Sequence, residues 1–213
     1  MAVFLLTDWL RYKPVIVFEG IETSGKSTNI NIAIKFLKKK RKSFIKLREP
    51  GGTNFSEIIR KLLLNQKLKL NNKTDLLLFY ASRSENFEKI IKKNYKKKII
   101  LIDRFTDSTV AYQHFGMKID LKIIKTLNKF IIGKFKPNIT FLSVVNLKNL
   151  KSRLNKRLKL DRYDKFKFNF YNKVQRGYYK MSKNNGNYII IDSNKKSISE
   201  VKKVIINKLE KIT

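Results

Sequence analysis

The sequence contains no cysteine and only one histidine, His114, and these shortages exclude much of the chemistry that enzymes use. Without cysteine the chain can form neither a disulfide nor a thiolate metal site. A single histidine cannot supply a histidine cluster, and it has no cysteine nucleophile to activate. Whole classes of metal and thiol chemistry are therefore excluded.

Glycine and proline are scarce too, with eight and three residues in a chain of 213. No Pro/Gly/Ser-rich linker or internal repeat divides the sequence, so we expect a single domain over residues 1–213. No apolar run approaches the roughly 18 to 20 residues of a membrane span, and MAVFLLTDWL lacks the features of a signal peptide. We expect a soluble, cytoplasmic protein, with residues 1–13 as a surface extension that carries the only tryptophan, Trp9.

Acidic residues are few, because 16 Asp and Glu stand against 49 Lys and Arg and give a formal net charge of +33. Such an excess can indicate a nucleic-acid partner. Here the basic residues are scattered through almost every segment. The dense runs at 38–42 and 92–98 lie where helices are expected to end, a place where the helix dipole favours lysine. We therefore expect no nucleic-acid partner despite the charge.

Apolar, β-branched runs alternate with amphipathic stretches along the chain. Strands are expected at VIVFE (15–19), SFIKL (43–47), IILID (99–103), NITFLSVV (138–145) and NYIIID (187–192). Helices are expected at about 26–40, 54–64, 74–95, 120–135, 147–156, 166–183 and 197–212. This alternation predicts an α/β fold with five buried strands in a mostly parallel sheet and helices on both faces. Ligands of such sheets bind at the carboxyl ends of the strands.

The stretch GIETSGKST, residues 20–28, lies between the first expected strand and the first expected helix. Its Gly-x-x-x-x-Gly-Lys-Ser spacing is that of a P-loop, in which backbone amides and a helix N-terminus cradle phosphates. Lys26 is expected to reach the β- and γ-phosphates, and the Ser27 hydroxyl to bind Mg²⁺. The predicted ATP-binding residues are Gly20, Ile21, Glu22, Thr23, Ser24, Gly25, Lys26, Ser27 and Thr28.

A second candidate group follows the strand expected at 99–103, which ends in Asp103-Arg104. A carboxylate at the carboxyl end of this strand suits Mg²⁺ binding or proton acceptance, and an adjoining arginine suits a second phosphate. Alternatively, Asp103 caps a helix and Arg104 pairs with it. The guanine-specifying Asn-Lys-x-Asp motif is absent, which argues against a GTPase.

Three further motifs are LREPGGT at 47–53, LLLFYASR at 76–83 and LIDRFTDSTVAYQ at 101–113. With the P-loop they resemble the thymidylate kinase family, in register from about Val15 to the last expected helix. The resemblance implies a P-loop nucleoside monophosphate kinase fold that transfers the γ-phosphoryl group of ATP to dTMP with Mg²⁺, in dTTP biosynthesis. Members are usually homodimers, so a homodimer is implied as well.

The resemblance also implies roles for residues that match its motifs. Phe79 would stack on thymine and Arg83 would hydrogen-bond the edge of the base; residues four apart do share one helix face. From the residues alone, Phe79 belongs to a hydrophobic stripe with Leu76 and Leu78. The other implied acceptor contacts are Glu22 at the sugar hydroxyl, Arg104 with Arg48 and Arg60 at the phosphate, Pro50 beneath the nucleotide, and Ser108, Tyr112 and Gln113 around base and sugar.

Position 23 departs from the family's pattern, which has arginine there in one branch and usually glycine in the bacterial-like branch. This chain has Thr23, so a lid segment at about 153–165 is expected to supply the positive charge instead. Alternatively, this segment is a basic helix end without a catalytic role. Arg157 is the first lid candidate, and the predicted catalytic residues are Lys26, Asp103, Arg104, Arg153, Arg157 and Arg162.

Two other functions remain open. A deoxynucleoside kinase shares the P-loop and the Asp-Arg pair but phosphorylates an uncharged 5′-hydroxyl. A nucleic-acid-binding P-loop ATPase would use the net charge and would show DNA-stimulated turnover that falls steeply with salt. A second clamp on an acceptor phosphate argues against the former, and the lack of an aromatic and basic stacking strip argues against the latter.

Overall fold

The computed structural model describes residues 13–158, 160–183 and 185–213. The expected surface extension at 1–13, with Trp9, lies outside the described residues apart from Lys13. Lys159, within the expected lid segment, lies outside them as well.

Within these ranges, the chain forms one sheet of parallel strands in the order β2-β3-β1-β4-β5. The strands are β1 (Val15–Glu19), β2 (Phe44–Arg48), β3 (Ile99–Asp103), β4 (Ile139–Val144) and β5 (Tyr188–Asp192). The strand positions agree with the sequence prediction to within one residue at each end. The expectation that all five strands are buried is wrong for β2 and β5, which are only partly buried. These two lie at the sheet edges, where a strand has a neighbour on one side only.

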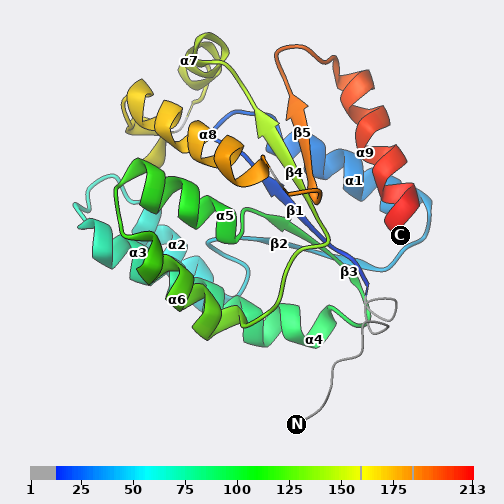
Figure 1. Cartoon of the computed structure of the whole chain (residues 1–213), viewed down its shortest axis with the longest axis horizontal. Coiled ribbons are helices and arrows are strands. Elements are labelled where there is room, and N and C mark those ends of the chain that lie inside the picture. Colours follow the sequence, from blue (N-terminus) through cyan, green and yellow to red (C-terminus); the bar gives the residue numbers. More distant parts are fainter. Residues whose placement is uncertain (1–12, 159, 184) are drawn as a thin grey trace.

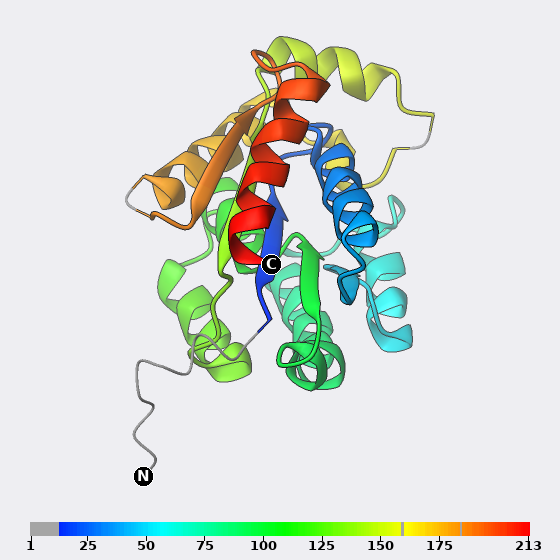
Figure 2. The same ribbon diagram turned by 90° about the vertical axis from the view of Figure 1, so that its right-hand side faces the viewer.

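Helices connect the strands and cover both faces of the sheet (Figures 1 and 2). They are α1 (Lys26–Lys39), α2 (Asn54–Leu64), α3 (Asn72–Asn86), α4 (Lys92–Asn94), α5 (Thr106–Thr109), α6 (Leu121–Ile132), α7 (Leu147–Asn155), α8 (Phe168–Ser182) and α9 (Ile198–Ile212), with the π-helical η2 (Phe87–Ile91) and η3 (Val110–Gly116) and the 3-10 turn η4 (Tyr163–Lys165).

Alternation of side chains along the strands divides the core into layers. Ile16 and Phe18 of β1 face α1 and α9, whose buried residues share their cluster. Val15 and Val17 point to the opposite face, toward η2 and α6. A third cluster packs β4 against α7, α8 and η3. The sheet is thus covered on both faces, and the carboxyl ends of its strands meet at one edge.

Two helical segments differ from the prediction. The helix expected at 74–95 contains a π-helical stretch, η2, between α3 and α4. No helix was expected at 106–116, where α5 and η3 lie. The sequence TDSTVAYQHFG lacks a clear apolar stripe at helical spacing, and the segment is helical because it packs on α8.

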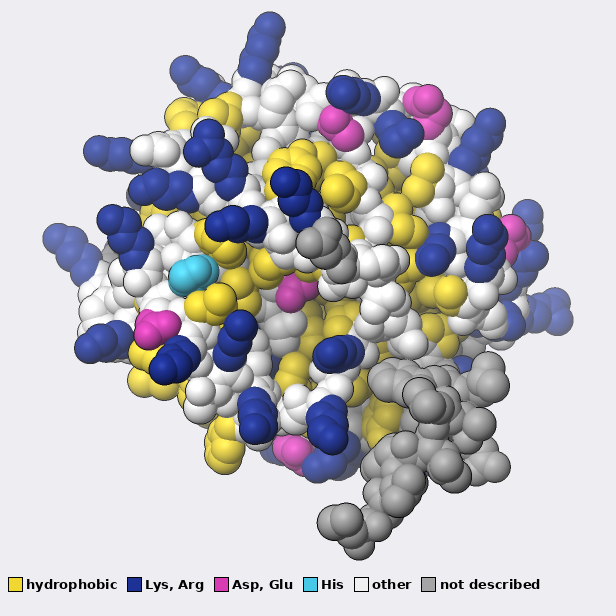
Figure 3. Space-filling model, viewed as in Figure 1, with side chains coloured by type: hydrophobic (Ala, Val, Ile, Leu, Met, Phe, Trp, Pro, Cys, Tyr) yellow, Lys and Arg dark blue, Asp and Glu magenta, His cyan; other side chains and the backbone are white. Residues whose placement is uncertain are grey.

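Lysine and arginine side chains spread over the visible face of the molecule rather than forming one stripe (Figure 3). None of the helices in the described ranges is long and apolar enough to cross a bilayer.

Candidate active site

A cavity of about 500 Å³ opens at the carboxyl ends of β1, β2 and β3. It brings together side chains from the P-loop, α2, α3, η3 and the lid segment. The predicted site residues that line it are Glu22, Thr23, Lys26, Ser27, Arg48, Pro50, Arg60, Phe79, Arg83, Asp103, Arg104, Ser108, Tyr112, Gln113 and Arg157. Those that do not line it are Gly20, Ile21, Ser24, Gly25, Thr28, Arg153 and Arg162.

The P-loop joins β1 to α1 through a backbone that two glycines permit. Gly20 has φ 138°, and a Cβ there would lie 2.2 Å from the carbonyl oxygen of Ser143. Gly25, with φ 99°, is the N-cap of α1. Thr23 also has a positive φ, 52°, a conformation that costs a β-branched residue about 1–2 kcal/mol. The loop therefore presents its backbone at the N-terminus of α1, as phosphate binding requires.

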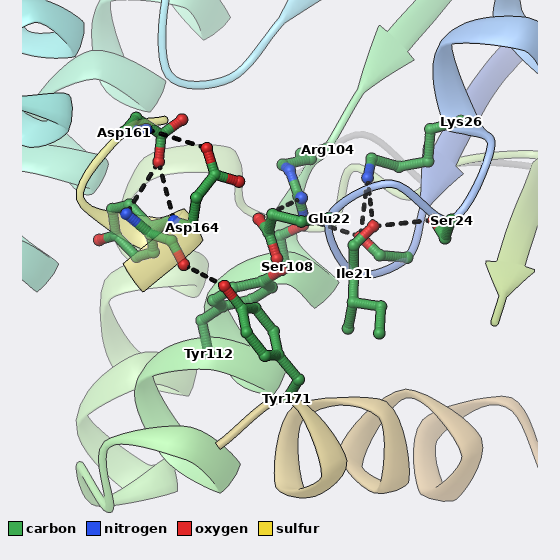
Figure 4. Close-up of polar contacts among 12 residues, drawn as sticks. Ile21, Glu22, Ser24, Lys26, Arg104, Ser108, Tyr112, Asp161, Asp164 and Tyr171 are labelled. Atoms are coloured by element: carbon green, nitrogen blue, oxygen red, sulfur yellow. Dashed lines mark hydrogen bonds and ion pairs between the residues drawn. The ribbon is translucent and has the colours of Figure 1, made fainter. Parts of the chain in front are cut away.

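The ammonium group of Lys26 lies inside this loop. It donates to the carbonyl oxygens of Gly20 at 3.0 Å and Ile21 at 2.8 Å (Figure 4). Burial lowers the pKa of Lys26 to about 8, and repulsion from the nearby Arg104 adds to this shift. A phosphate near the ammonium would offset both effects.

Arg104 spans the gap between β1 and the segment that follows β3. Its Nη2 donates to Glu22 at 2.8 Å and its Nη1 to the Gly20 carbonyl at 2.9 Å. The Tyr112 hydroxyl donates to the second oxygen of Glu22, and burial raises the pKa of Tyr112 well above its usual value, so it stays a donor. The structure therefore pairs Arg104 with Glu22 (Figure 4), in place of the alternative pairing with Asp103.

Two buried oxygen atoms at the P-loop end of the cavity lack hydrogen-bond partners among the described residues. They are Oδ1 of Asp103 and Oγ1 of Thr23. The described chain contains no group of three or more His, Cys, Asp or Glu side chains suited to a metal ion. A hydroxyl from Ser27 and a carboxylate from Asp103 nevertheless fit Mg²⁺, which takes most of its ligands from water and phosphates.

The other end of the cavity is aromatic, and its walls are largely buried. Phe79 on α3 lines it, with its ring 6.0 Å from that of Tyr163. Arg83, one helical turn further, is 1 % exposed and donates to Glu49 at 2.7 Å. Its Nη2 donates to the Phe105 carbonyl and the Thr109 hydroxyl, both at 3.0 Å. Most of the guanidinium of Arg83 is thus used to hold the pocket's own walls.

The side chains predicted near the acceptor phosphate are more loosely held. Arg48 pairs with Glu57 at 2.8 Å, and both side chains are more than a third exposed. Arg60 donates to the carbonyl oxygen of Pro50 at 2.8 Å. Pro50 follows a cis peptide bond. Both arginines reach the cavity wall while keeping partners within α2 and the loop before it.

The three lid arginines take different positions. Arg157 lines the cavity and pairs with Asp164. Arg153 donates to the carbonyl oxygen of Thr23 at 2.9 Å, beside the P-loop. Arg162 faces away from the P-loop, because it pairs with Asp75 on α3 and donates to the Leu63 carbonyl at 2.8 Å.

Sequence reasoning missed Glu19, the last residue of β1. Its fully buried carboxylate accepts hydrogen bonds from the backbone amides of Phe105 at 2.8 Å and Ser108 at 3.1 Å, and from the Ser108 and Tyr178 hydroxyls. Burial raises the pKa of Glu19, and repulsion from Asp107 adds to the shift. Glu19 thus holds the start of α5 beside Arg104. A charge ending an otherwise apolar strand was the available signal.

The comparisons with known proteins agree with this geometry. The family model described as thymidylate kinase matches residues 18–205. A thymidylate kinase from Thermosipho africanus is 39% identical over 92% of this chain and 98% of its own length, and one from Kosmotoga olearia is 35% identical over 90% and 92%. The crystal structure of thymidylate kinase from Ehrlichia chaffeensis superposes with a TM-score of 0.74 at 33% identity, covering 93% of this chain and 98% of that one. The fold is therefore that of a P-loop nucleoside monophosphate kinase, and this chain belongs to the thymidylate kinase family.

Proposed function

We propose that this chain transfers the γ-phosphoryl group of ATP to dTMP and forms dTDP and ADP, in the biosynthesis of dTTP. The observation that carries the proposal is the continuity of one cavity. It runs from the P-loop, through Arg104, to the pocket of Phe79 and Arg83. Arg104 gives the acceptor side a cation of its own, as a nucleoside monophosphate requires. The related proteins named thymidylate kinase support the same acceptor.

The transfer depends on positioning and on electrostatic stabilisation rather than on covalent chemistry. Lys26 binds the β- and γ-phosphates of ATP, and Arg104 binds the acceptor phosphate. Arg157, from the lid, stabilises charge on the transferring group. Ser27 and Asp103 would hold Mg²⁺, which supplies neutralisation of phosphate charge when bound. Closure of the lid excludes water and so limits ATP hydrolysis.

The acceptor base lies between Phe79 and the residues of η3. Phe79 stacks on thymine, Arg83 hydrogen-bonds the base edge, and Gln113 lies beside it. Glu22 accepts from a sugar hydroxyl, and Tyr112 crowds the 2′ position and so favours deoxyribose. The buried ion pair of Arg83 and Glu49 supports this assignment, because it fixes the guanidinium at the wall of the pocket.

The chain acts as a cytoplasmic homodimer in this proposal. Large apolar side chains remain exposed on three neighbouring helices, α2, α3 and α6: they are Phe55, Ile58, Leu62, Leu77, Ile123 and Phe130. Phe130 is the most exposed of the six, at 85 %, and large exposed apolar patches mark interaction sites. Analytical ultracentrifugation at micromolar concentration should show a dimer, and Phe130→Asp should shift it toward the monomer.

The function is tested by ADP release from Mg²⁺-ATP with dTMP, dUMP, dCMP, thymidine or single-stranded DNA as the second component. We expect turnover with dTMP far above that with the other four. Turnover with thymidine alone would instead indicate a deoxynucleoside kinase, and stimulation by DNA alone would indicate a nucleic-acid-dependent ATPase. Either result would overturn the proposal.

A further inference from the structure

Tyr163, in the short turn η4 that ends the lid segment, lines the acceptor end of the cavity. Its side chain is 6 % exposed. Its ring meets those of Phe79 and Tyr112 edge to face, with centroids 6.0 Å apart in both cases. The lid thus contributes a third aromatic wall to a pocket whose other two walls come from α3 and η3.

The hydroxyl of Tyr163 is fixed by a buried carboxylate. It donates to Oδ2 of Asp75, a residue that is 1 % exposed in the first turn of α3. Burial raises the pKa of Tyr163 well above its usual value, and the charge of Asp75 adds to this, so the hydroxyl keeps its proton. Asp75 also pairs with Arg162 and accepts from Gln113 at 3.4 Å. One carboxylate therefore joins the lid turn to α3 and η3.

Asp164, the residue after Tyr163, connects this turn to the lid arginine Arg157. The carboxylate of Asp164 is buried, pairs with Arg157 and accepts from the backbone amide of Asp161 at 2.9 Å. The Tyr171 hydroxyl of α8 donates to the Tyr163 carbonyl and so ties the turn to α8. Figure 4 shows Asp161, Asp164 and Tyr171 gathered around this turn, with Glu22 and Arg104 between them and Lys26. The position of Arg157 therefore depends on the same turn as the position of the Tyr163 ring.

We propose that Tyr163 is a positioning residue that couples the acceptor base to the lid. Its ring closes the base pocket from the lid side, and its bond to Asp75 fixes the turn from which Asp164 holds Arg157. This inference rests on the proposed function. A base seated against Phe79 packs on the Tyr163 ring and stabilises this turn further, so Arg157 is held more firmly over the transferring group when the acceptor is bound. The chain then hydrolyses little ATP when dTMP is absent.

Three variants test this coupling: Tyr163→Ala removes the ring, Tyr163→Phe removes only the hydroxyl, and Tyr179→Ala is the control, because Tyr179 is 41 % exposed on α8 and does not line the cavity. The readouts are kcat, the KM for dTMP, the KM for ATP, and the inorganic phosphate released per dTDP formed. Together they separate a positioning role from a merely structural one.

We expect Tyr163→Ala to raise the KM for dTMP about tenfold and to leave the KM for ATP within about twofold, because an aromatic contact to the acceptor is lost. Phosphate released per dTDP should rise severalfold. Tyr163→Phe should keep the KM for dTMP and lower kcat by roughly threefold, because a single hydrogen bond that fixes the turn is lost. Tyr179→Ala should match the wild type in all four quantities.

The proposal is overturned if Tyr163→Ala keeps both the KM for dTMP and the phosphate-to-dTDP ratio of the wild type. It is also overturned if the KM values for dTMP and ATP rise together. If Tyr163→Ala does not fold, Tyr163→Leu is measured with the same readouts and the same expected direction. A wild-type chain that turns over dTMP and fails these tests contradicts the coupling alone. One that forms no dTDP overturns the proposed function and the coupling with it.

Discussion

The two ends of the cavity are held in different ways. At the base end, around Phe79, the buried Arg83 donates to the buried Glu49. Nearby, the buried Asp75 accepts from Gln113 of η3 and from Tyr163 of the lid segment. At the phosphate end, where the cavity meets the P-loop, Lys26 donates to backbone carbonyls, and Arg104 donates to the Gly20 carbonyl and to the carboxylate of Glu22. The base end is thus held by buried side chains of several elements, whereas both cations of the phosphate end are held by residues of one loop.

Unpartnered buried oxygens show the same difference among the described residues. Two of them, on Thr23 and Asp103, lie at the phosphate end, and one, on Glu49, lies at the base end. Each such atom costs about 1–3 kcal/mol if nothing binds to it. The phosphate end therefore gains more from a nucleotide and its metal than the base end gains from a nucleobase. The proposed base pocket is held by buried side chains, and the proposed phosphate site has the buried oxygens that a nucleotide and its metal would satisfy.

The largest effect should come from the phosphate end. Lys26→Ala should lower kcat by about 10³-fold or more, because a cation at the transferring phosphates is lost. Binding of dTMP, measured by calorimetry, should change by less than about threefold, since no acceptor contact is removed. Lys35→Ala, an exposed lysine on the same helix, is the matched control and should behave as wild type. Loss of dTMP binding in Lys26→Ala would show that the two ends are not separable.

At the base end, a buried charge should be the most sensitive feature. Arg83→Met should lower the free energy of unfolding by about 3–5 kcal/mol, because the buried carboxylate of Glu49 is left unpaired. Urea denaturation measures this loss. Adding Glu49→Gln to Arg83→Met should restore part of it, whereas Lys89→Met, at a side chain that is 62% exposed, should cost little. An Arg83→Met variant of wild-type stability would contradict a base end held by this buried ion pair.

The lid should link the two ends through one arginine rather than three. We expect Arg157→Ala to lower kcat by about tenfold or more with the KM for dTMP nearly unchanged, because Arg157 alone of the three lines the cavity. Arg162→Ala should instead reduce stability, since it leaves the buried Asp75 without its ion pair. Lys156→Ala, next to Arg157 and exposed, is the control. If none of the three arginines lowers turnover tenfold, the lid does not supply the missing charge.

The smallest expected effect is the change in ATP affinity with pH. The pKa of Lys26 is lowered to about 8, so the free chain loses this charge as pH rises through 8. ATP should therefore bind about tenfold more weakly at pH 9 than at pH 7, because only the protonated lysine attracts the phosphates. Binding of dTMP, which depends on arginine, serves as the control in the same titration. If the affinities for ATP and dTMP fell equally with pH, the titration of Lys26 would not explain the weaker binding of ATP.

Much of the phosphate end was predictable from the sequence. Its signals are local: the P-loop spacing places Lys26 and Ser27, and the end of an apolar strand places Asp103. The sheet was predictable for the same reason, since buried strands appear as short apolar runs. The base end was reached through Phe79 and Arg83, and only by resemblance to a family.

What the sequence could not show are the partners that hold these residues. Glu49, Asp75 and Tyr163 contact residues 34 or more positions away, such as Arg83 for Glu49 and Asp75 for Tyr163, and no local pattern marks such pairs. Arg162 has the same residue type and a similar setting in the sequence as Arg157, yet it pairs with Asp75 on α3. Only the packing of the lid on α3 shows that Arg157 faces the cavity and Arg162 does not.

The most direct test of phosphoryl transfer to dTMP is to identify the product. Purified chain is incubated with dTMP, ATP and Mg²⁺, the nucleotides are separated by anion-exchange chromatography, and dTDP, ADP and inorganic phosphate are quantified. We expect one dTDP for each ADP and little inorganic phosphate, and a rate of formation of both nucleotides that is lower by about 10³-fold or more with Lys26→Ala. Release of ADP with inorganic phosphate in place of dTDP would contradict this transfer.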